Sequence, residues 1–232
     1  MTLPADCLAR PFAHRGLHDR RNGVIENTRS AFDAAVAQGY GIELDVQMSR
    51  DGVPVVFHDP RLDRLTDLEG PVRSLTAEQL ATVRLTGSDD VILPLADVLA
   101  QIGDRVPVLV EIKDQTCDLG PEQAVGQVVA EVARGGARLA VMSFRHTYIH
   151  ALDWLPAGVH LGLTTEGDGP IEGWRDALDF ISHDHTTLSS AAVAQVKQHG
   201  GSVLCWTIRG QQQADAALQY ADQITFEGFA PA

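Results

Sequence analysis

The sequence has few cysteines, and none are spaced as a metal-binding or redox motif. Only Cys7, Cys117 and Cys205 occur among its 232 residues. An odd number of widely separated cysteines argues against a disulfide framework and predicts free thiols in a reducing compartment. Residues 1–10 also lack the apolar run of a signal peptide. We therefore expect the protein to be cytoplasmic.

Long apolar runs and excess positive charge are absent as well. No stretch approaches the roughly 18 to 20 apolar residues of a membrane span, so we expect no stable membrane insertion. Lys and Arg number 18 against 31 Asp and Glu, which gives a net charge of -13 without any basic run. This charge opposes binding to nucleic acid and leaves a small molecule as the expected partner. It does not indicate an oligomeric state.

No Pro/Ser-rich linker, low-complexity segment or repeat divides the chain, so we expect one domain over residues 1–232. Short β-branched runs alternate with amphipathic helical patterns. The expected strands are 11–15, 40–46, 106–112, 138–144, 160–164, 179–183, 202–208 and 223–226. The clearest expected helices are 27–38, 121–134, 190–198 and 211–220, and a further helix is expected at 95–102.

Eight strands that alternate with helices in about 230 residues predict a TIM (β/α)8 barrel. A doubly wound open sheet is the alternative, but the chain lacks a Gly-rich phosphate fingerprint. Residues 60–94 are mostly polar, with one short helical pattern near Thr76–Val83. We expect this segment to be an insertion over the barrel mouth.

Asp51-Gly52 lies between two strand-like runs and predicts a hairpin with a two-residue loop. The segment 53–59 would then be an extra strand, antiparallel to the second barrel strand. That loop pairs Arg50 with Val53 and therefore places Asp45 opposite His58. Glu43 shares the face of Asp45, because side chains alternate along a strand. The predicted hairpin therefore brings the side chains of Glu43, Asp45 and His58 together on one face.

Three carboxylates fall near the carboxyl ends of adjacent predicted strands, where TIM barrels carry their active sites. They are Glu43, Asp45 and Glu111. Such an oxygen-rich group suits one hard divalent cation, Mg²⁺ or Ca²⁺, and without a cation the carboxylates would repel one another. The alternative is a solvated strand face that carries structural salt bridges.

His14 and His58 flank these carboxylates and provide an acid and a base that titrate near neutral pH. Arg15 and Lys113 supply fixed positive charge for an anionic group. The combination suits hydrolysis of a phosphate ester, in which one histidine removes a proton and the other protonates the leaving oxygen. Lys113 could instead simply pair with a neighbouring acid.

Two residues on later strands are further candidates for the pocket wall. His185 follows the strand predicted at 179–183, and Trp206 lies near the end of the strand predicted at 202–208. His185 could equally be solvated, and Trp206 could be ordinary barrel filling.

Several ordered motifs resemble the glycerophosphodiester phosphodiesterase family, and the resemblance runs from about Phe12 to Phe226. The motifs are His14-Arg15-Gly16, Glu26-Asn27-Thr28, Gly41-Ile42-Glu43-Leu44-Asp45-Val46, Asp51-Gly52 through His58-Asp59, Leu62-Asp63-Arg64-Leu65-Thr66, Glu111-Ile112-Lys113 and Trp206-Thr207. The resemblance implies a metal-dependent TIM-barrel hydrolase that cuts glycerophosphodiesters to sn-glycerol 3-phosphate and an alcohol.

The resemblance also implies individual roles. Glu43, Asp45 and Glu111 would bind the metal, and His14 and His58 would be the acid/base pair. Arg15 and Lys113 would hold the phosphate. Glu26 would orient Arg15, although it could be only a helix-start acid. In the family mechanism the glycerol 2-hydroxyl attacks phosphorus, and water then opens the cyclic phosphate.

One segment departs from the family pattern. Family members commonly end the last strand with Thr-Asp, whereas this chain reads Thr225-Phe226-Glu227. Glu227 could replace that aspartate, but a shift of one residue along a strand points a side chain to the other face.

Three rival functions remain open. One is lysophospholipase D-type cleavage of lysophospholipids, and another is a non-catalytic phosphodiester-binding barrel. The third is a His-ligated metallohydrolase, and the absence of a His-x-His pair at His14-Arg15-Gly16 counts against it.

Overall fold

The computed structural model describes residues 2–115, 120–171 and 178–231, so Cys117 lies outside the described residues. The strands are β1 (Phe12–Ala13), β2 (Gly41–Met48), β3 (Pro54–Val56), β4 (Val108–Ile112), β5 (Leu139–Ser143), β6 (Val159–Thr165), β7 (Phe180–Asp184), β8 (Ser202–Ile208) and β9 (Gln223–Phe226). The α-helices are α1 (Arg29–Gln38), α2 (Ala77–Leu80), α3 (Leu95–Ile102), α4 (Pro121–Ala133), α5 (His146–His150), α6 (Ala191–Gln198) and α7 (Gln211–Ala217). Three short 3-10 helices are η1 (Arg20–Asn22), η2 (Val72–Ser74) and η3 (His185–Thr187).

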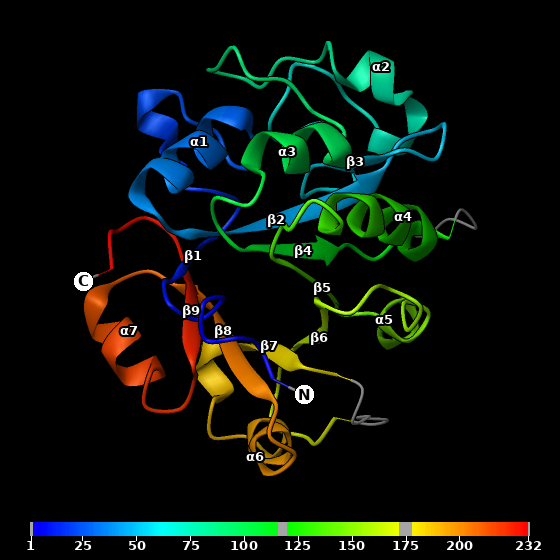
Figure 1. Ribbon diagram of the computed structural model, residues 1–232. Coiled ribbons are helices and arrows are strands. Elements are labelled where there is room, and N and C mark those ends of the chain that lie inside the picture. The colour runs from blue at the N-terminus through cyan, green and yellow to red at the C-terminus, as the bar shows by residue number, and fades with distance from the viewer. Residues whose placement is uncertain (1, 116–119, 172–177, 232) are drawn as a thin grey trace.

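Parallel strands close into a barrel, and helices surround it (Figure 1). The neighbours follow the order β1-β9-β8-β7-β6-β5-β4-β2, and a pairing between β1 and β2 closes the ring. The TIM-barrel prediction is therefore confirmed. Among the described residues, no helix is long and apolar enough to cross a membrane.

Alternate residues of each strand point toward the helices or into the barrel. The outward side chains, such as Ile42, Leu44 and Val110, pack with the helices in the largest apolar cluster. A second cluster fills the barrel interior and consists of Leu3, Phe12, Leu109, Ala140, Met142, Phe180 and Leu204. In β2 and β4, the inward residues nearer the carboxyl ends are acidic, so the interior changes from apolar to ionisable along the barrel axis.

Residues 60–94, the segment predicted to be an insertion, lie between β3 and α3 in the chain and carry η2 and α2, the latter at the top of Figure 1. Its helix is shorter than the pattern at 76–83 suggests. The insertion has its own apolar cluster, in which Leu62, Leu65 and Leu80 pack with Val55 and Phe57 of the hairpin arm. This packing ties the insertion to the chain segment that precedes His58.

The hairpin between β2 and β3 forms, but the predicted register is wrong by one residue. Val46 lies opposite Val56 and Gln47 opposite Val55, so Asp45 faces Phe57 and not His58. The main-chain nitrogen of Ser49 donates to the carbonyl of Val53 (3.0 Å), which makes a three-residue loop.

One contact with the insertion and one backbone conformation explain the longer loop. The Arg50 main-chain nitrogen donates to the carbonyl of Leu75 in the insertion (2.8 Å) and not to the opposite arm. Gly52 adopts a left-handed conformation with φ +76°, which a Gly tolerates at the end of a three-residue loop. The Asp-Gly signal is compatible with either loop length, and the contact with the insertion favours the longer one.

Candidate active site

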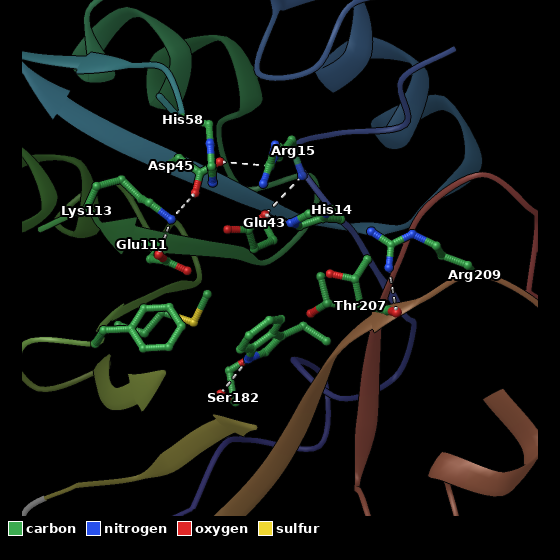
Figure 2. Close-up of a pocket in the computed structure, with 14 residues that line it drawn as sticks. His14, Arg15, Glu43, Asp45, His58, Glu111, Lys113, Ser182, Thr207 and Arg209 are labelled. Atoms are coloured by element: carbon green, nitrogen blue, oxygen red, sulfur yellow. Dashed lines mark hydrogen bonds and ion pairs between the residues drawn. The ribbon is translucent and has the colours of Figure 1, made fainter. Parts of the chain in front are cut away.

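A cavity of about 290 Å³ opens at the carboxyl ends of the barrel strands (Figure 2). Its lining residues are His14, Arg15, Glu43, Asp45, His58, Glu111, Lys113, Met142, Phe144, Ser182, Trp206, Thr207, Arg209 and Thr225. Eight of the ten site residues predicted from sequence are among them. The exceptions are Glu26 and His185.

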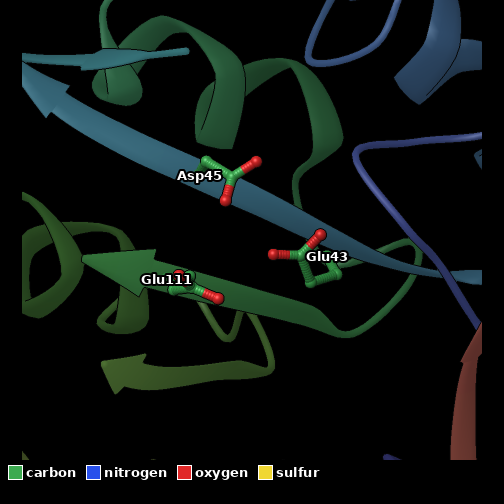
Figure 3. Close-up of side chains that lie close together, drawn as sticks. All are labelled: Glu43, Asp45 and Glu111. Carbon is green, nitrogen blue, oxygen red and sulfur yellow. The ribbon is translucent and has the colours of Figure 1, made fainter. Parts of the chain in front are cut away.

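The three carboxylates meet on the inner face of two neighbouring strands. Asp45 of β2 lies beside Glu111 of β4 in the parallel register, and Glu43 lies two residues before Asp45. Oxygen atoms of the three side chains lie within 4.8 Å of one another (Figure 3). All three residues are buried, with at most 6% of their surface exposed.

The buried carboxylates have unequal proton affinities. Burial, followed by repulsion from Asp45 and Glu111, raises the pKa of Glu43 well above its ordinary value. Burial also raises the pKa of Glu111. For Asp45, attraction from Lys113 and Arg15 outweighs the effect of burial and lowers the pKa to about 2. All the donor atoms are carboxylate oxygens. When ionised, the three carboxylates outnumber the two neighbouring cations, Arg15 and Lys113, so the group fits a hard divalent cation.

Arg15 occupies a constrained turn directly after β1. Its φ is +55° and that of Gly16 is +80°, a region that disfavours most side chains. A Cβ on Gly16 would lie 2.9 Å from Ala31, so the close approach of α1 requires glycine here. The main-chain nitrogen of Arg15 donates to Glu43 (3.0 Å), and its carbonyl accepts from Asn27 (2.8 Å).

The two cations of the cavity are anchored by carboxylates. The Arg15 guanidinium donates to Glu26 (2.7 Å) and lies 3.2 Å from Asp45. Lys113 Nζ donates to Glu111 (2.7 Å) and lies 3.4 Å from the other oxygen of Asp45. Both positive groups therefore lie against the carboxylate cluster and also line the cavity.

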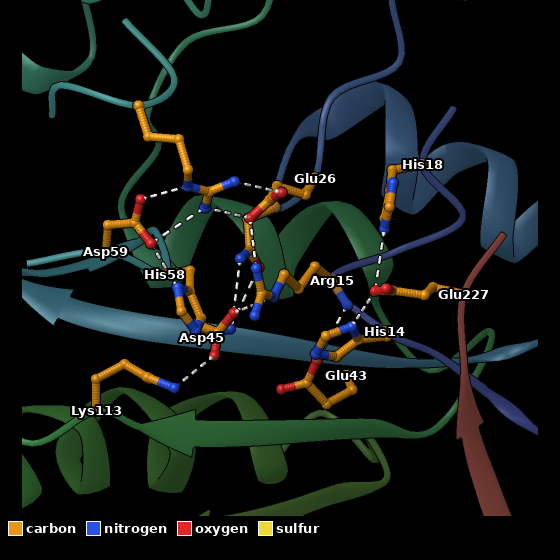
Figure 4. A network of polar contacts seen from close by, with 12 residues as sticks. His14, Arg15, His18, Glu26, Glu43, Asp45, His58, Asp59, Lys113 and Glu227 are labelled. Atoms are coloured by element: carbon orange, nitrogen blue, oxygen red, sulfur yellow. Dashed lines mark hydrogen bonds and ion pairs between the residues drawn. The ribbon is translucent and has the colours of Figure 1, made fainter. Parts of the chain in front are cut away.

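His58 reaches the cavity because β3 ends at Val56 and the chain leaves the sheet. Gln47 donates to the carbonyl of His58 (2.8 Å), and His58 Nδ1 lies 2.6 Å from Asp59 (Figure 4). Burial lowers the pKa of His58, although Asp45 opposes this effect. The side chain thus lies near the carboxylates without the cross-strand pairing that the sequence predicts.

His14 lies on the opposite side of the carboxylates from His58, as Figure 4 shows. Its Nδ1 is 2.5 Å from Glu227, and its Nε2 is 4.0 Å from Glu43. Each of the two cavity histidines therefore has a carboxylate at Nδ1.

Sequence reasoning missed the supporting roles of several residues. Asn27 donates to Asp45 (2.8 Å), and Arg64 of the insertion donates to both Glu26 and Asp59. Both residues lie in motifs that resemble the family, Glu26-Asn27-Thr28 and Leu62 to Thr66, which is the signal that could have marked them. No pattern within the hairpin indicates the bond from Gln47.

The later strands provide a mostly uncharged wall. Trp206 donates through Nε1 to the carbonyl of Ser182 (2.9 Å), and its ring meets Phe144 edge to face at 5.8 Å. His185 does not line this cavity. Its Nδ1 lies 3.2 Å from the carbonyl of Trp206, and its Nε2 contacts Gln213, so its link to the wall is indirect.

Together, the fold and the ionisable groups at its mouth place the protein among the TIM-barrel enzymes that act on anionic substrates. The chain belongs to the glycerophosphoryl diester phosphodiesterase family, whose model matches residues 14–224.

One relative in sequence carries the same family name, and two solved structures share the fold. The chain is 28% identical over 228 residues to a glycerophosphodiester phosphodiesterase of Caldanaerobacter subterraneus, covering 89% of this chain and 88% of the relative. It is similar in structure to the glycerophosphodiester phosphodiesterase of Agrobacterium tumefaciens, with a TM-score of 0.72, 23% identity and coverage of 97% and 96%. An Oleispira antarctica phosphodiesterase, solved with the product sn-glycerol-3-phosphate, gives a TM-score of 0.77, 22% identity and coverage of 97% and 93%.

Proposed function

We propose that this protein hydrolyses glycerophosphodiesters to sn-glycerol 3-phosphate and an alcohol. One observation carries the proposal: three buried carboxylates, two histidines and two cations line a single cavity at the carboxyl end of the barrel. The family assignment supports the same reaction.

Glu43, Asp45 and Glu111 would hold one divalent cation, Mg²⁺ or Ca²⁺, through their carboxylate oxygens. When bound, the cation would neutralise negative charge on the phosphate and on the reacting oxygens. With a cation bound, all three side chains can be ionised, and together with Arg15 and Lys113 they would carry one net negative charge. The two positive charges of the ion would then make the sum positive, which would attract an anionic phosphodiester.

Arg15 and Lys113 would bind the phosphate. Arg15 presents a planar guanidinium that can donate two parallel hydrogen bonds to phosphate oxygens. This guanidinium donates a hydrogen bond to Glu26 (2.7 Å), and Arg64 also donates to Glu26. Lys113 adds a point charge beside Glu111.

His14 and His58 would move the two protons of the reaction. In the first step one imidazole would take the proton of the attacking glycerol 2-hydroxyl, and the other would give a proton to the leaving alkoxide, which leaves a cyclic phosphate. In the second step the two would exchange roles, so that water opens the cyclic phosphate to sn-glycerol 3-phosphate and both imidazoles return to their starting state. Burial lowers the pKa of His58, which favours its neutral form near neutral pH.

The test is a coupled assay for glycerol 3-phosphate over glycerophosphodiesters with different head groups, with and without a chelator. We expect activity in the wild type, and loss of activity on chelation and in His58→Ala and Glu43→Ala. Glu131→Gln, on an exposed position of α4, is the control and should keep full activity.

Two results would contradict the proposal. Full activity of His58→Ala would exclude the acid/base role of that residue. Failure of the wild type to release glycerol 3-phosphate from any glycerophosphodiester would exclude the reaction. Binding without turnover would then favour a binding barrel, and turnover of lysophosphatidylcholine alone would favour a lysophospholipase D.

We also propose that the protein works in the cytoplasm. Cys7 and Cys205 are free and buried, and burial raises the pKa of their thiols to about 11 and about 12. Such thiols fit a reducing compartment, and fractionation of cells that produce the protein would test the location.

A further inference from the structure

The carboxylate that contacts His14 comes from the other end of the chain. Strand β1 pairs in parallel with β9, with Ala13 beside Phe226, and the His14 main-chain nitrogen donates to the carbonyl of Phe226 (2.9 Å). This register brings Glu227, the first residue after β9, to His14. Its carboxylate oxygen lies 2.5 Å from Nδ1 of the imidazole.

Neighbouring groups hold Glu227 in place. Its main-chain nitrogen donates to the carbonyl of Ile208 (3.0 Å), and its second carboxylate oxygen lies 2.7 Å from Arg209. His18 lies 3.7 Å from the oxygen that contacts His14. The backbone of Glu227 is therefore held by a hydrogen bond, and each of its two carboxylate oxygens has a positively charged or imidazole neighbour.

The contact determines which nitrogen of His14 carries hydrogen. The hydrogen bond with His14 and the nearby imidazole of His18 hold the pKa of Glu227 far below its ordinary value, so the carboxylate is ionised and can only accept. Nδ1 must then be the donor in this bond. The other nitrogen, Nε2, faces the carboxylate cluster and lies 4.0 Å from Glu43.

We propose that Glu227 is the positioning residue for His14, which it holds as the Nδ1–H tautomer with Nε2 directed into the cavity. This inference rests on the proposed function, in which His14 moves a proton. His58 has the corresponding partner in Asp59, its neighbour in sequence. The two histidines thus reach the same arrangement by different routes, one local and one through the closure of the barrel.

The position of Glu227 resolves the mismatch seen in sequence. Phe226 takes the place where family members commonly carry an aspartate, and its ring packs against Tyr40 (4.8 Å) and Phe229 (5.7 Å). Because β9 ends at Phe226, the alternation of faces does not apply to Glu227. Glu227 can therefore turn toward the cavity one residue later.

Kinetics of three variants test the proposal. For Glu227→Ala we expect kcat to fall about 10- to 100-fold with KM nearly unchanged, as is usual when a residue that orients a reacting group is lost. Glu227→Asp should recover part of the activity, because it keeps a charged acceptor. Glu227→Gln keeps the size of the side chain and should also lose kcat, because it cannot stabilise a protonated imidazole. Glu131→Gln is the charge-loss control.

A spectroscopic measurement separates positioning from a purely structural role. Long-range ¹H–¹⁵N spectra of the full chain with labelled histidine report the tautomer, and His14→Asn identifies the His14 signals. We expect an Nδ1–H imidazole in the wild type and a shift toward Nε2–H in Glu227→Ala. Arg209→Gln should keep the wild-type tautomer, because the contact with Glu227 is direct.

The outcomes distinguish this inference from the proposed function. The wild type could be inactive and still show an Nδ1–H tautomer of His14 that is lost in Glu227→Ala. That result would refute the proposed reaction but not the positioning of His14 by Glu227. An Nε2–H tautomer in the wild type, or unchanged kcat and spectra in Glu227→Ala, would overturn the inference. If Glu227→Ala does not fold, Glu227→Leu, which also lacks an acceptor, takes its place in both readouts.

Discussion

The two sides of the cavity wall differ in charge. The side formed by β1, β2, the hairpin arm and β4 carries His14, Arg15, Glu43, Asp45, His58, Glu111 and Lys113. The side formed by β5, β7, β8 and β9 carries Met142, Phe144, Ser182, Trp206, Thr207 and Thr225, with Arg209 following β8 (Figure 2).

This difference assigns separate tasks to the two sides. The charged side concentrates groups that are costly to bury unless they bind ions, so it suits the cation and the phosphate. The mostly uncharged side can contact carbon and hydroxyl groups at little cost, so it suits the rest of the substrate. Four predictions test this division, from the largest expected effect to the smallest.

Glu43→Gln should abolish measurable turnover, because it removes a ligand of the proposed cation. Without added cation, the variant should be at least as stable as the wild type, since it removes a buried carboxylate whose pKa burial has raised. A cation at about 100 times its Kd should stabilise only the wild type, by about 2.7 kcal/mol. Thermal melts with and without Mg²⁺ or Ca²⁺ measure this, and equal stabilisation of both proteins would refute the metal site.

His58→Asn should lower kcat by about 10²- to 10⁴-fold with a smaller change in KM, because the side chain acts on a proton and not on substrate binding. Steady-state kinetics at neutral pH measure the effect. Asp59→Asn should give a smaller loss, since it removes only the partner of His58. A larger loss in Asp59→Asn than in His58→Asn would contradict the assignment.

Glu26→Gln should lower the free energy of unfolding in a pH-dependent way. Burial alone would raise the pKa of Glu26, but Arg64 and Arg15 lower it from 4.5 to about 2. The stabilisation is therefore full above about pH 4.5 and is lost as the pH falls toward about 2. We expect a difference of about 1.5–3 kcal/mol near neutral pH.

Urea unfolding of wild type and Glu26→Gln across this range measures the difference. Asp63→Asn is a matched control, because Asp63 also accepts from an arginine, Arg61, but in an exposed pair. Such a pair contributes about 0–1 kcal/mol. An undiminished effect of Glu26→Gln at about pH 2 would contradict the role of its charge.

Phe144→Ala should give the smallest effect, a rise in KM of about 2- to 10-fold with kcat nearly unchanged. The ring packs edge to face on Trp206, and such pairs contribute about 0.5–1.5 kcal/mol. Steady-state kinetics with a glycerophosphodiester measure the change in KM. A fall in kcat comparable to that of His58→Asn would contradict the assignment of separate tasks to the two sides of the cavity.

Much of the barrel could be predicted from the sequence because its signals are local. Helix α3 and strands β8 and β9 have the predicted bounds, since apolar patterning alone marks them. The alternation along β2 likewise predicts Glu43 and Asp45 on one face, and the structure places both inside the barrel. Local patterning failed at the hairpin, where the contact between Arg50 and Leu75 shifts the register.

By itself, the sequence determined the type of fold, the chemical groups of the site and their order along the chain, because these depend on periodicity and on residue type. Only the tertiary structure decided how the groups are supported. Arg64 joins Glu26 to Asp59, and Glu227 reaches His14 across 213 positions in sequence. Such contacts depend on barrel closure and on the folding of the insertion, which bring distant residues together and which no local pattern specifies.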